Sequence, residues 1–117
     1  MWSLRPETAV YVCVEPVDFR WGLNGLVALI EHSLRLDPFT GSCFVFSNRR
    51  RDKVKIVTWE RNGFWLCYKR LERERFVWPR AADAVLVLSM EQLGWLLSGI
   101  DLAALRGHQV LHYRRAS

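Results

Sequence analysis

Several features that would indicate a membrane segment, a disulfide framework or a zinc site are missing from this chain of 117 residues. No apolar run approaches the ~20 residues of a membrane span, and the N-terminus lacks the continuous apolar segment of a secretory signal. The three cysteines are odd in number and form no Cys-x-x-Cys pair; they are Cys13, Cys43 and Cys67. Each lies in an apolar run, which predicts small buried strand residues. We therefore expect a cytoplasmic protein with no membrane partner.

Motifs typical of catalysis are also missing. The chain has no phosphate loop of the Walker type and no His-Glu-x-x-His motif. His108 and His112 are four residues apart, but the tail supplies no acid or Cys to complete a metal site. The acids that could hold a nuclease metal all lie beside turn or cap signals; they are Asp18, Asp37, Asp52, Glu60 and Asp101. The sequence predicts no catalytic residue, no metal, no cofactor and no small-molecule substrate.

Positive charge is present in excess and is confined to the middle third of the chain. Residues 49–80 hold 11 Lys or Arg against 4 acids, a net +7, whereas residues 1–48 carry a net −2 and residues 81–117 none. Such clustering is expected of a surface that binds an anion, although arginine-rich hairpins can also be simply soluble edges. The candidate residues for binding nucleic acid or a protein partner are Arg20, Arg49, Arg50, Arg51, Lys53, Lys55, Lys69, Arg70, Arg73 and Arg75.

Arg20 joins this set because of the stretch "VDFRWG", which has two interpretations. Asp18 and Arg20 can form a buried or partly buried ion pair that fixes a strand-to-helix turn. Alternatively, Arg20 can hold a phosphate or a partner carboxylate at the N-terminus of the following helix.

Hydrophobic periodicity predicts two main helices and five to six short strands. Runs of β-branched and aromatic residues predict strands at 9–14, 42–46, 75–78 and 84–88. Helical spacing predicts a helix over 24–36, stopped by Pro38, with a Glu31–Arg35 pair four residues apart.

Ser89 and Gln92 predict a capping box at the start of the second helix, and Gly99 predicts its end. Leu93, Leu96, Leu97 and Ile100 form its expected apolar face. The expected architecture is α+β: a single two-layer domain over 1–117, with a mainly antiparallel sheet and a frayed basic tail at 103–117.

The dipeptide Asn62-Gly63 between two β-prone runs predicts a hairpin with a type I′ turn. If these two residues form the loop, Trp59 pairs with Leu66 and Val57 with Tyr68, which places all four side chains on one face. The segment "YKRLERERFVWP" (68–79) follows this hairpin. It predicts a strand end to Arg70, a charged turn at 71–74 and a short strand at 75–78. Packing is expected of Tyr68, Leu71, Phe76 and Trp78.

Four segments together resemble the TnpB accessory proteins, made by the second reading frame of bacterial insertion sequences of the family numbered sixty-six. They are "PVDFRWGLNGL", "LDPFTGSCFVFSNRRRDKVKIVTW", "GFWLCYKRLERERFVWP" and "LSMEQLGWLLSGID", within about residues 9–101. The resemblance implies a role in transposition beside a separate, catalytic transposase. It assigns structural roles to Asp18, Gly22, Pro38, Gly41, Trp59, Gly63, Tyr68, Phe76, Trp78 and Pro79.

The chain departs from the family pattern in two informative places. Family members usually have Asp-Gly where Glu60-Arg61 stands, which implies a hairpin loop longer than two residues. They usually have glycine in place of Glu74, which implies a turn there.

Three functions stay open at this point. The chain can bind DNA through residues 49–80, either at the element ends or as non-specific duplex. It can instead dock on the transposase of the same element without touching DNA. A third possibility is a nuclease that uses Asp18 and Glu60.

Overall fold

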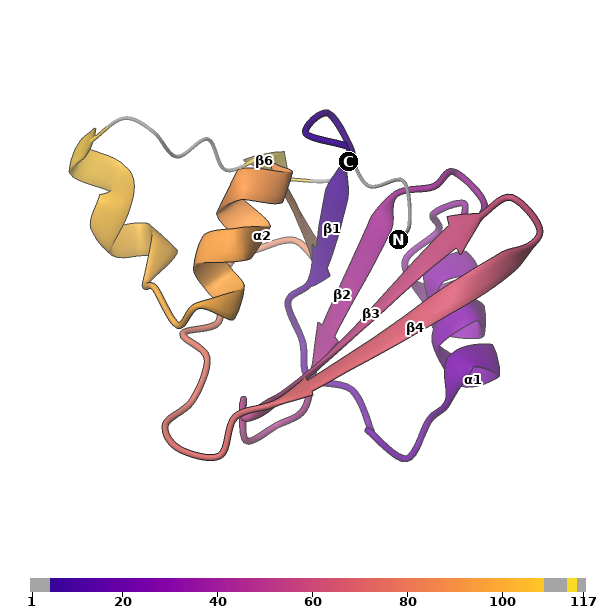
Figure 1. Cartoon of the computed structure of the whole chain (residues 1–117), viewed down its shortest axis with the longest axis horizontal. Helices are drawn as coiled ribbons and strands as arrows, with labels where there is room; N and C mark the ends of the chain where they lie inside the picture. Colours follow the sequence, from indigo (N-terminus) through magenta and orange to yellow (C-terminus); the bar gives the residue numbers. More distant parts are fainter. Residues whose placement is uncertain (1–4, 109–113, 116–117) are drawn as a thin grey trace.

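The computed structural model describes residues 5–108 and 114–115. Their strands form one sheet in the order β4-β3-β2-β1-β5-β6, in which only β1 and β2 run parallel (Figure 1). The elements are β1 (Val10–Cys13), α1 (Leu23–Ala28), the π-helical turn η1 (Leu29–Ser33), β2 (Cys43–Ser47), β3 (Lys53–Glu60), β4 (Gly63–Arg70), β5 (Val85–Leu88), α2 (Met90–Leu97), the 3₁₀ turn η2 (Leu102–His108) and β6 (Arg114–Arg115). The predicted α+β class is confirmed. Nowhere in the described residues is a helix both long and apolar enough to cross a membrane.

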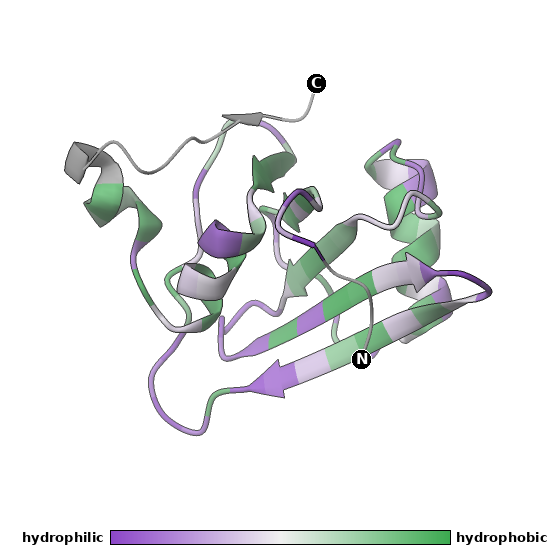
Figure 2. Cartoon of the chain, turned by 45° about the horizontal axis from the view of Figure 1, so that its top comes forward, coloured by the Kyte–Doolittle hydropathy of each residue, from purple (hydrophilic) through white to green (hydrophobic). Residues whose placement is uncertain are grey.

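The two helices pack against opposite faces of the sheet. Val10 and Val12 of β1 share a core cluster with Leu93 and Leu96 of α2, whereas Cys13 at the end of β1 packs on the side of α1. Helices therefore cover both faces, where a single helical layer was expected. This explains why all five residues of β2 are buried and why its first four, Cys43–Phe46, are a continuous apolar run without alternation (Figure 2).

The first helix ends earlier than its periodicity predicts. The α-helical hydrogen bonding of α1 gives way to η1, in which the Leu34 amide donates to the Leu29 carbonyl. Arg35 then takes a left-handed φ of 57°, so it leaves the helix and cannot pair with Glu31 along a helical face. Leu34 and Leu36 pack against the α1-side core. Helical structure ends at Ser33 and the chain turns at Arg35, so the predicted continuation to residue 36 and the stop at Pro38 are wrong.

The second helix agrees closely with its sequence signals. The Ser89 hydroxyl accepts the Gln92 amide at 3.0 Å and the Gln92 side chain accepts the Ser89 amide at 2.9 Å, which confirms the capping box. Gly99 has a φ of +86° just after the helix, as a C-terminal stop requires. Ile100, expected on the apolar face, is 37% exposed instead.

The hairpin is displaced by one residue from the predicted position. Glu60 pairs with Gly63, so the loop consists of Arg61 and Asn62, and Arg61 rather than a glycine takes the left-handed φ of 57°. Both earlier predictions, an Asn62-Gly63 loop and a longer loop, are wrong. Trp59 now pairs with Phe64, and their rings meet edge to face at 5.0 Å. This aromatic contact favours the observed register over the one predicted from the turn dipeptide.

Residues 71–84 cross from β4, at one edge of the sheet, to β5 beside β1. The predicted turn is confirmed by bends at 72–74 and by a φ of 64° at Glu74. The strand predicted at 75–78 does not form. Phe76 instead donates its amide to the Arg51 carbonyl at 2.7 Å, and the Trp78 ring nitrogen donates to the Cys13 carbonyl at 3.0 Å. These contacts fasten the crossing segment without a strand ladder.

Replacing Glu74 by glycine is expected to raise the free energy of unfolding by about 0.5–1 kcal/mol. The left-handed conformation costs a residue with a Cβ about 1–2 kcal/mol, of which the greater unfolded-state entropy of glycine offsets about 0.5–1 kcal/mol. Urea denaturation measures the difference. Glu74→Ala is the matched control, because it removes the same charge and keeps the Cβ. A glycine variant no more stable than the alanine variant would contradict the expected release of strain.

Candidate nucleic-acid interface

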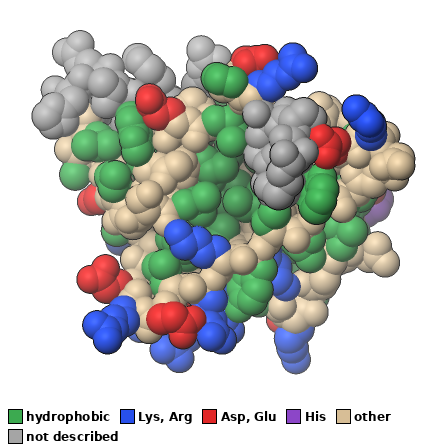
Figure 3. Space-filling view, in the orientation of Figure 1, with side chains coloured by type: hydrophobic (Ala, Val, Ile, Leu, Met, Phe, Trp, Pro, Cys, Tyr) green, Lys and Arg blue, Asp and Glu red, His purple; other side chains and the backbone are tan. Residues whose placement is uncertain are grey.

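Two basic loops meet at the end of the sheet where β3 begins and β4 ends. Residues 48–53 and 69–76, together called the basic loop cluster, contain eight Lys or Arg and three acids. Two backbone hydrogen bonds join them: Leu71 donates to the Asp52 carbonyl at 2.8 Å and Phe76 to the Arg51 carbonyl at 2.7 Å. The hydrophilic ends of β3 and β4 are visible in Figure 2, and Lys and Arg side chains gather at this end of the molecule in Figure 3. Segments distant in sequence thus form one positively charged surface.

Asn48 fixes the shape of the first loop. Its side-chain oxygen accepts the amides of Asp52 and Lys53 at 3.2 and 3.1 Å, and its side-chain nitrogen donates to the Asp52 carboxylate at 2.6 Å. The last of these bonds holds the pKa of Asp52 below its usual value, so this acid stays ionised beside the arginines. The loop is therefore built by its own hydrogen bonds.

Arg51 faces the interior rather than solvent. Its guanidinium donates to the Val14 carbonyl at 2.9 Å and lies over the Trp78 ring, 5.2 Å from the centroid. Burial lowers its pKa, and its Nη1 atom is buried without a hydrogen-bond partner among the described residues. Arg51 thus stabilises the crossing segment and does not present its charge to a ligand.

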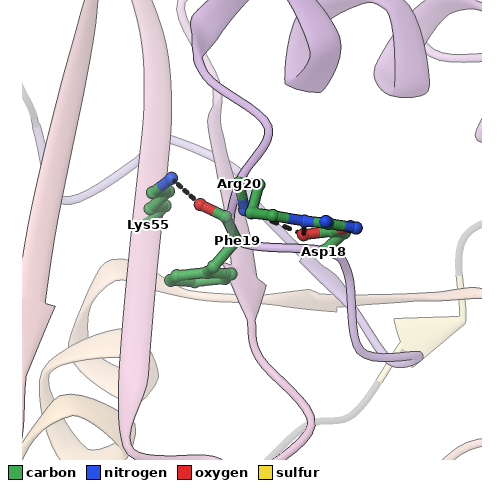
Figure 4. Close-up of polar contacts among 4 residues, drawn as sticks. All are labelled: Asp18, Phe19, Arg20 and Lys55. Atoms are coloured by element: carbon green, nitrogen blue, oxygen red, sulfur yellow. Dashed lines mark hydrogen bonds and ion pairs between the residues drawn. The ribbon is translucent and has the colours of Figure 1, made fainter.

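Lys55 likewise uses its charged group in contacts within the protein (Figure 4). Its ammonium donates to the carbonyls of Phe19 and Trp21, both at 2.9 Å, and lies 4.8 Å from the centre of the Phe19 ring. These contacts tie the middle of β3 to the turn before α1. The lysine therefore fixes that turn, a role expected earlier of the neighbouring Asp18 and Arg20.

Asp18 and Arg20 form the predicted ion pair, in which Asp18 is half-buried and Arg20 is exposed. The guanidinium makes two bonds of 3.0 Å and one of 2.6 Å to the carboxylate, while the Arg20 side chain is 90% accessible to solvent. Hydrogen bonding from Arg20 lowers the pKa of Asp18 to about 2, so the pair persists at neutral pH. The charge of Arg20 is thereby balanced by its neighbour (Figure 4).

Lys69 and Arg70 lie within the basic loop cluster but have protein partners. The Lys69 ammonium donates to the Leu97 carbonyl at 2.9 Å, at the C-terminal end of α2, where a cation is favourable. The Arg70 guanidinium pairs with Glu72 at 2.8 Å. Both residues are exposed.

The remaining predicted cations form no side-chain hydrogen bond or ion pair with any residue in 5–108. Of these five cations, Lys53 is half-buried and the other four are exposed. The four exposed residues, called here the exposed arginines, are Arg49, Arg50, Arg73 and Arg75. Two come from each loop, so the joined loops hold all four on one end of the sheet.

The motif residues support the fold around this surface. Gly41 has a φ of +84° in the turn before β2, and Gly22 precedes the first residue of α1. Trp59 packs against Phe39, with ring centroids 5.0 Å apart. Phe76, Pro38 and Pro79 are buried, and Gly63 begins β4. Tyr68 packs only in part: its ring meets Phe19 edge to face with centroids 6.4 Å apart, and the residue is 55% exposed.

The candidate catalytic acids have structural contacts. Asp18 is held by Arg20, and the Glu60 carboxylate accepts the Trp65 ring N–H at 2.9 Å. Within 5–108 and 114–115, no three His, Cys, Asp or Glu residues converge on a possible metal position; His112 lies outside the described residues. Burial raises the pKa of Cys13 and of Cys43 to about 11, so both thiols are protonated at neutral pH.

Comparison with known proteins adds a family match. The model of the family described as IS66 Orf2 like protein matches residues 8–107. The protein named y4jC of Sinorhizobium fredii (strain NGR234) is 40% identical over 92 residues, which cover 79% of each chain. A second protein of that strain, y4hO, is 38% identical over 92 residues, covering 79% of this chain and 80% of its own length. No solved structure matches.

Proposed function

The chain belongs to the IS66 Orf2-like family, and from this premise we propose that it is a non-catalytic accessory factor of transposition that binds duplex DNA through the basic loop cluster. The observation that carries the proposal is the set of exposed arginines on two joined loops. Arginine is suited to phosphate because its planar guanidinium can donate two parallel hydrogen bonds.

The chemistry of the surface supports positioning on DNA rather than reading of its sequence. Contacts between arginines and phosphates set affinity and orientation but carry no base information. The backbone bonds of Leu71 and Phe76, together with the hydrogen bonds of Asn48, hold the loops in place before any ligand binds. Less ordering entropy is therefore lost on binding.

The second candidate function is docking on the transposase without DNA contact. It is favoured by the large apolar side chains exposed on β4, since Trp65, Leu66 and Tyr68 are 42%, 38% and 55% exposed. Tryptophan, tyrosine and arginine are the residues most often responsible for affinity in protein interfaces. This candidate uses an edge of the sheet as well as the basic loops.

A salt titration with labelled duplex DNA, with and without the transposase, tests the proposal. We expect log affinity to fall linearly with log salt, with a slope of about −3.6 if four phosphates are contacted. Absence of binding at low salt would overturn DNA binding. If the chain shows no affinity for DNA but still captures the transposase after nuclease treatment, the second candidate is established. Supercoiled plasmid with divalent metal should remain uncut, and nicking would contradict a non-catalytic role.

A further inference from the structure

The outer edge of β4 is available for pairing. β4 has β3 on one side and no strand on the other among the described residues. Its eight residues pair with β3 in an unbroken register from Lys53–Arg70 to Glu60–Gly63, without a bulge. In an antiparallel pair, every second residue directs its backbone N–H and C=O away from the partner. β4 therefore offers a regular row of hydrogen-bonding groups to another strand.

This edge lacks the usual protection against pairing. Natural edge strands are blunted by charged residues, prolines or bulges. The central run of β4, Phe64–Tyr68, contains no charge and no proline, and three of its side chains are large, apolar and exposed: Trp65, Leu66 and Tyr68. Only its C-terminal end carries cations, at Lys69 and Arg70. A strand with charged side chains along its length would have to bury them against the apolar centre of β4. A strand that is apolar at its centre and charged at one end matches β4 better.

We propose that β4 pairs with β4 of a second copy of this chain, antiparallel and centred on Leu66. In this register Leu66 faces its own copy, Phe64 faces Tyr68, and Trp65 faces Cys67, so apolar side chains meet apolar side chains. A parallel arrangement in register would instead place Lys69 on Lys69. The separation of like charges thus favours the antiparallel direction, and the match of apolar side chains favours a second β4 as the partner.

The shared sheet would have defined consequences. Lys69 and Arg70 of the two copies lie at opposite ends of the junction, so the two basic loop clusters remain apart and accessible. One strand pair is a small interface, so the two copies associate weakly and the dimer forms in proportion to concentration. Self-pairing does not depend on DNA and is tested without it.

Sedimentation velocity of the full chain, from about 1 to about 200 μM, should show a concentration-dependent monomer–dimer equilibrium. Leu66→Lys places two cations face to face and should raise the dissociation constant at least about tenfold. Val77→Lys is the matched control, since Val77 is 41% exposed outside β4 and its replacement should leave the equilibrium unchanged. Circular dichroism melting of each variant confirms that it is folded.

The register has its own test. Leu66→Glu should also dissociate the dimer. An equimolar mixture of the Leu66→Lys and Leu66→Glu variants should restore it, because a lysine of one copy then faces a glutamate of the other at position 66. Recovery in the mixture supports the proposal. A wild-type chain that stays monomeric throughout, or a dimer indifferent to both variants, would overturn it. Association that appears only with an added protein would assign the edge to a foreign strand instead.

Discussion

Replacing the exposed arginines by glutamine, in the variant Arg49→Gln, Arg50→Gln, Arg73→Gln and Arg75→Gln, is expected to weaken duplex DNA binding by about two to three orders of magnitude near 0.1 M salt. Each lost phosphate contact removes about 0.9 from the slope of log affinity against log salt. The four side chains form no hydrogen bond or ion pair with the described residues, so their loss should leave the unfolding transition nearly unchanged. Fluorescence anisotropy over a salt series measures both affinity and slope.

A matched variant separates this local effect from net charge. Arg5, Arg35, Arg61 and Arg80 are also exposed and lie outside the basic loop cluster. Replacing them by glutamine removes the same charge and should weaken binding by less than about tenfold, through long-range attraction alone. Equal losses in the two variants would show that net charge, rather than the basic loop cluster, governs DNA affinity.

Replacing Phe76 by alanine is expected to lower the free energy of unfolding by about 3–5 kcal/mol. Phe76 is 3% exposed and packs in the core cluster on the α2 side of the sheet. Its removal leaves a cavity and loosens the crossing segment that its amide attaches to Arg51. Urea denaturation followed by tryptophan fluorescence measures the loss.

The neighbouring residue supplies the control for this effect. Val77 is 41% exposed, so Val77→Ala should change the free energy of unfolding by no more than about 0.5 kcal/mol. A Phe76→Ala cost below about 1 kcal/mol would mean that the site collapses around the smaller side chain and that Phe76 does not anchor the crossing segment.

The elements predicted best are those specified by local chemistry. The capping box of Ser89 and Gln92 and the stop at Gly99 need only neighbouring residues, and all three take their expected geometry. β1, β2 and β5 follow from short β-branched runs. The turn near Glu74 follows from the family's preference for glycine at that position.

The features predicted poorly depend on contacts between distant residues. The hairpin register follows from the Trp59–Phe64 ring contact, which outweighs the turn preference of Asn62-Gly63. The internal role of Lys55 depends on carbonyls more than thirty positions earlier. One signal was available: Lys55 alternates with Val57 and Trp59 along β3, so a strand pattern places the lysine on their face. The placement of helices on both faces of the sheet also had a sequence signal, because the apolar run Cys43–Phe46 of β2 does not alternate with polar residues.

The strand order constrains how the chain can fold while it is being synthesised. β1 is made first but lies between β2 and β5, and Val10 pairs with both Cys43 and Leu88. The hairpin of β3 and β4 needs only local contacts and can form early. β1, in contrast, lacks one of its two neighbouring strands until β5 leaves the ribosome. Until then an apolar strand at the centre of the future sheet is exposed. A nascent chain of this protein therefore depends on prompt completion of residues 85–88 to avoid non-native association.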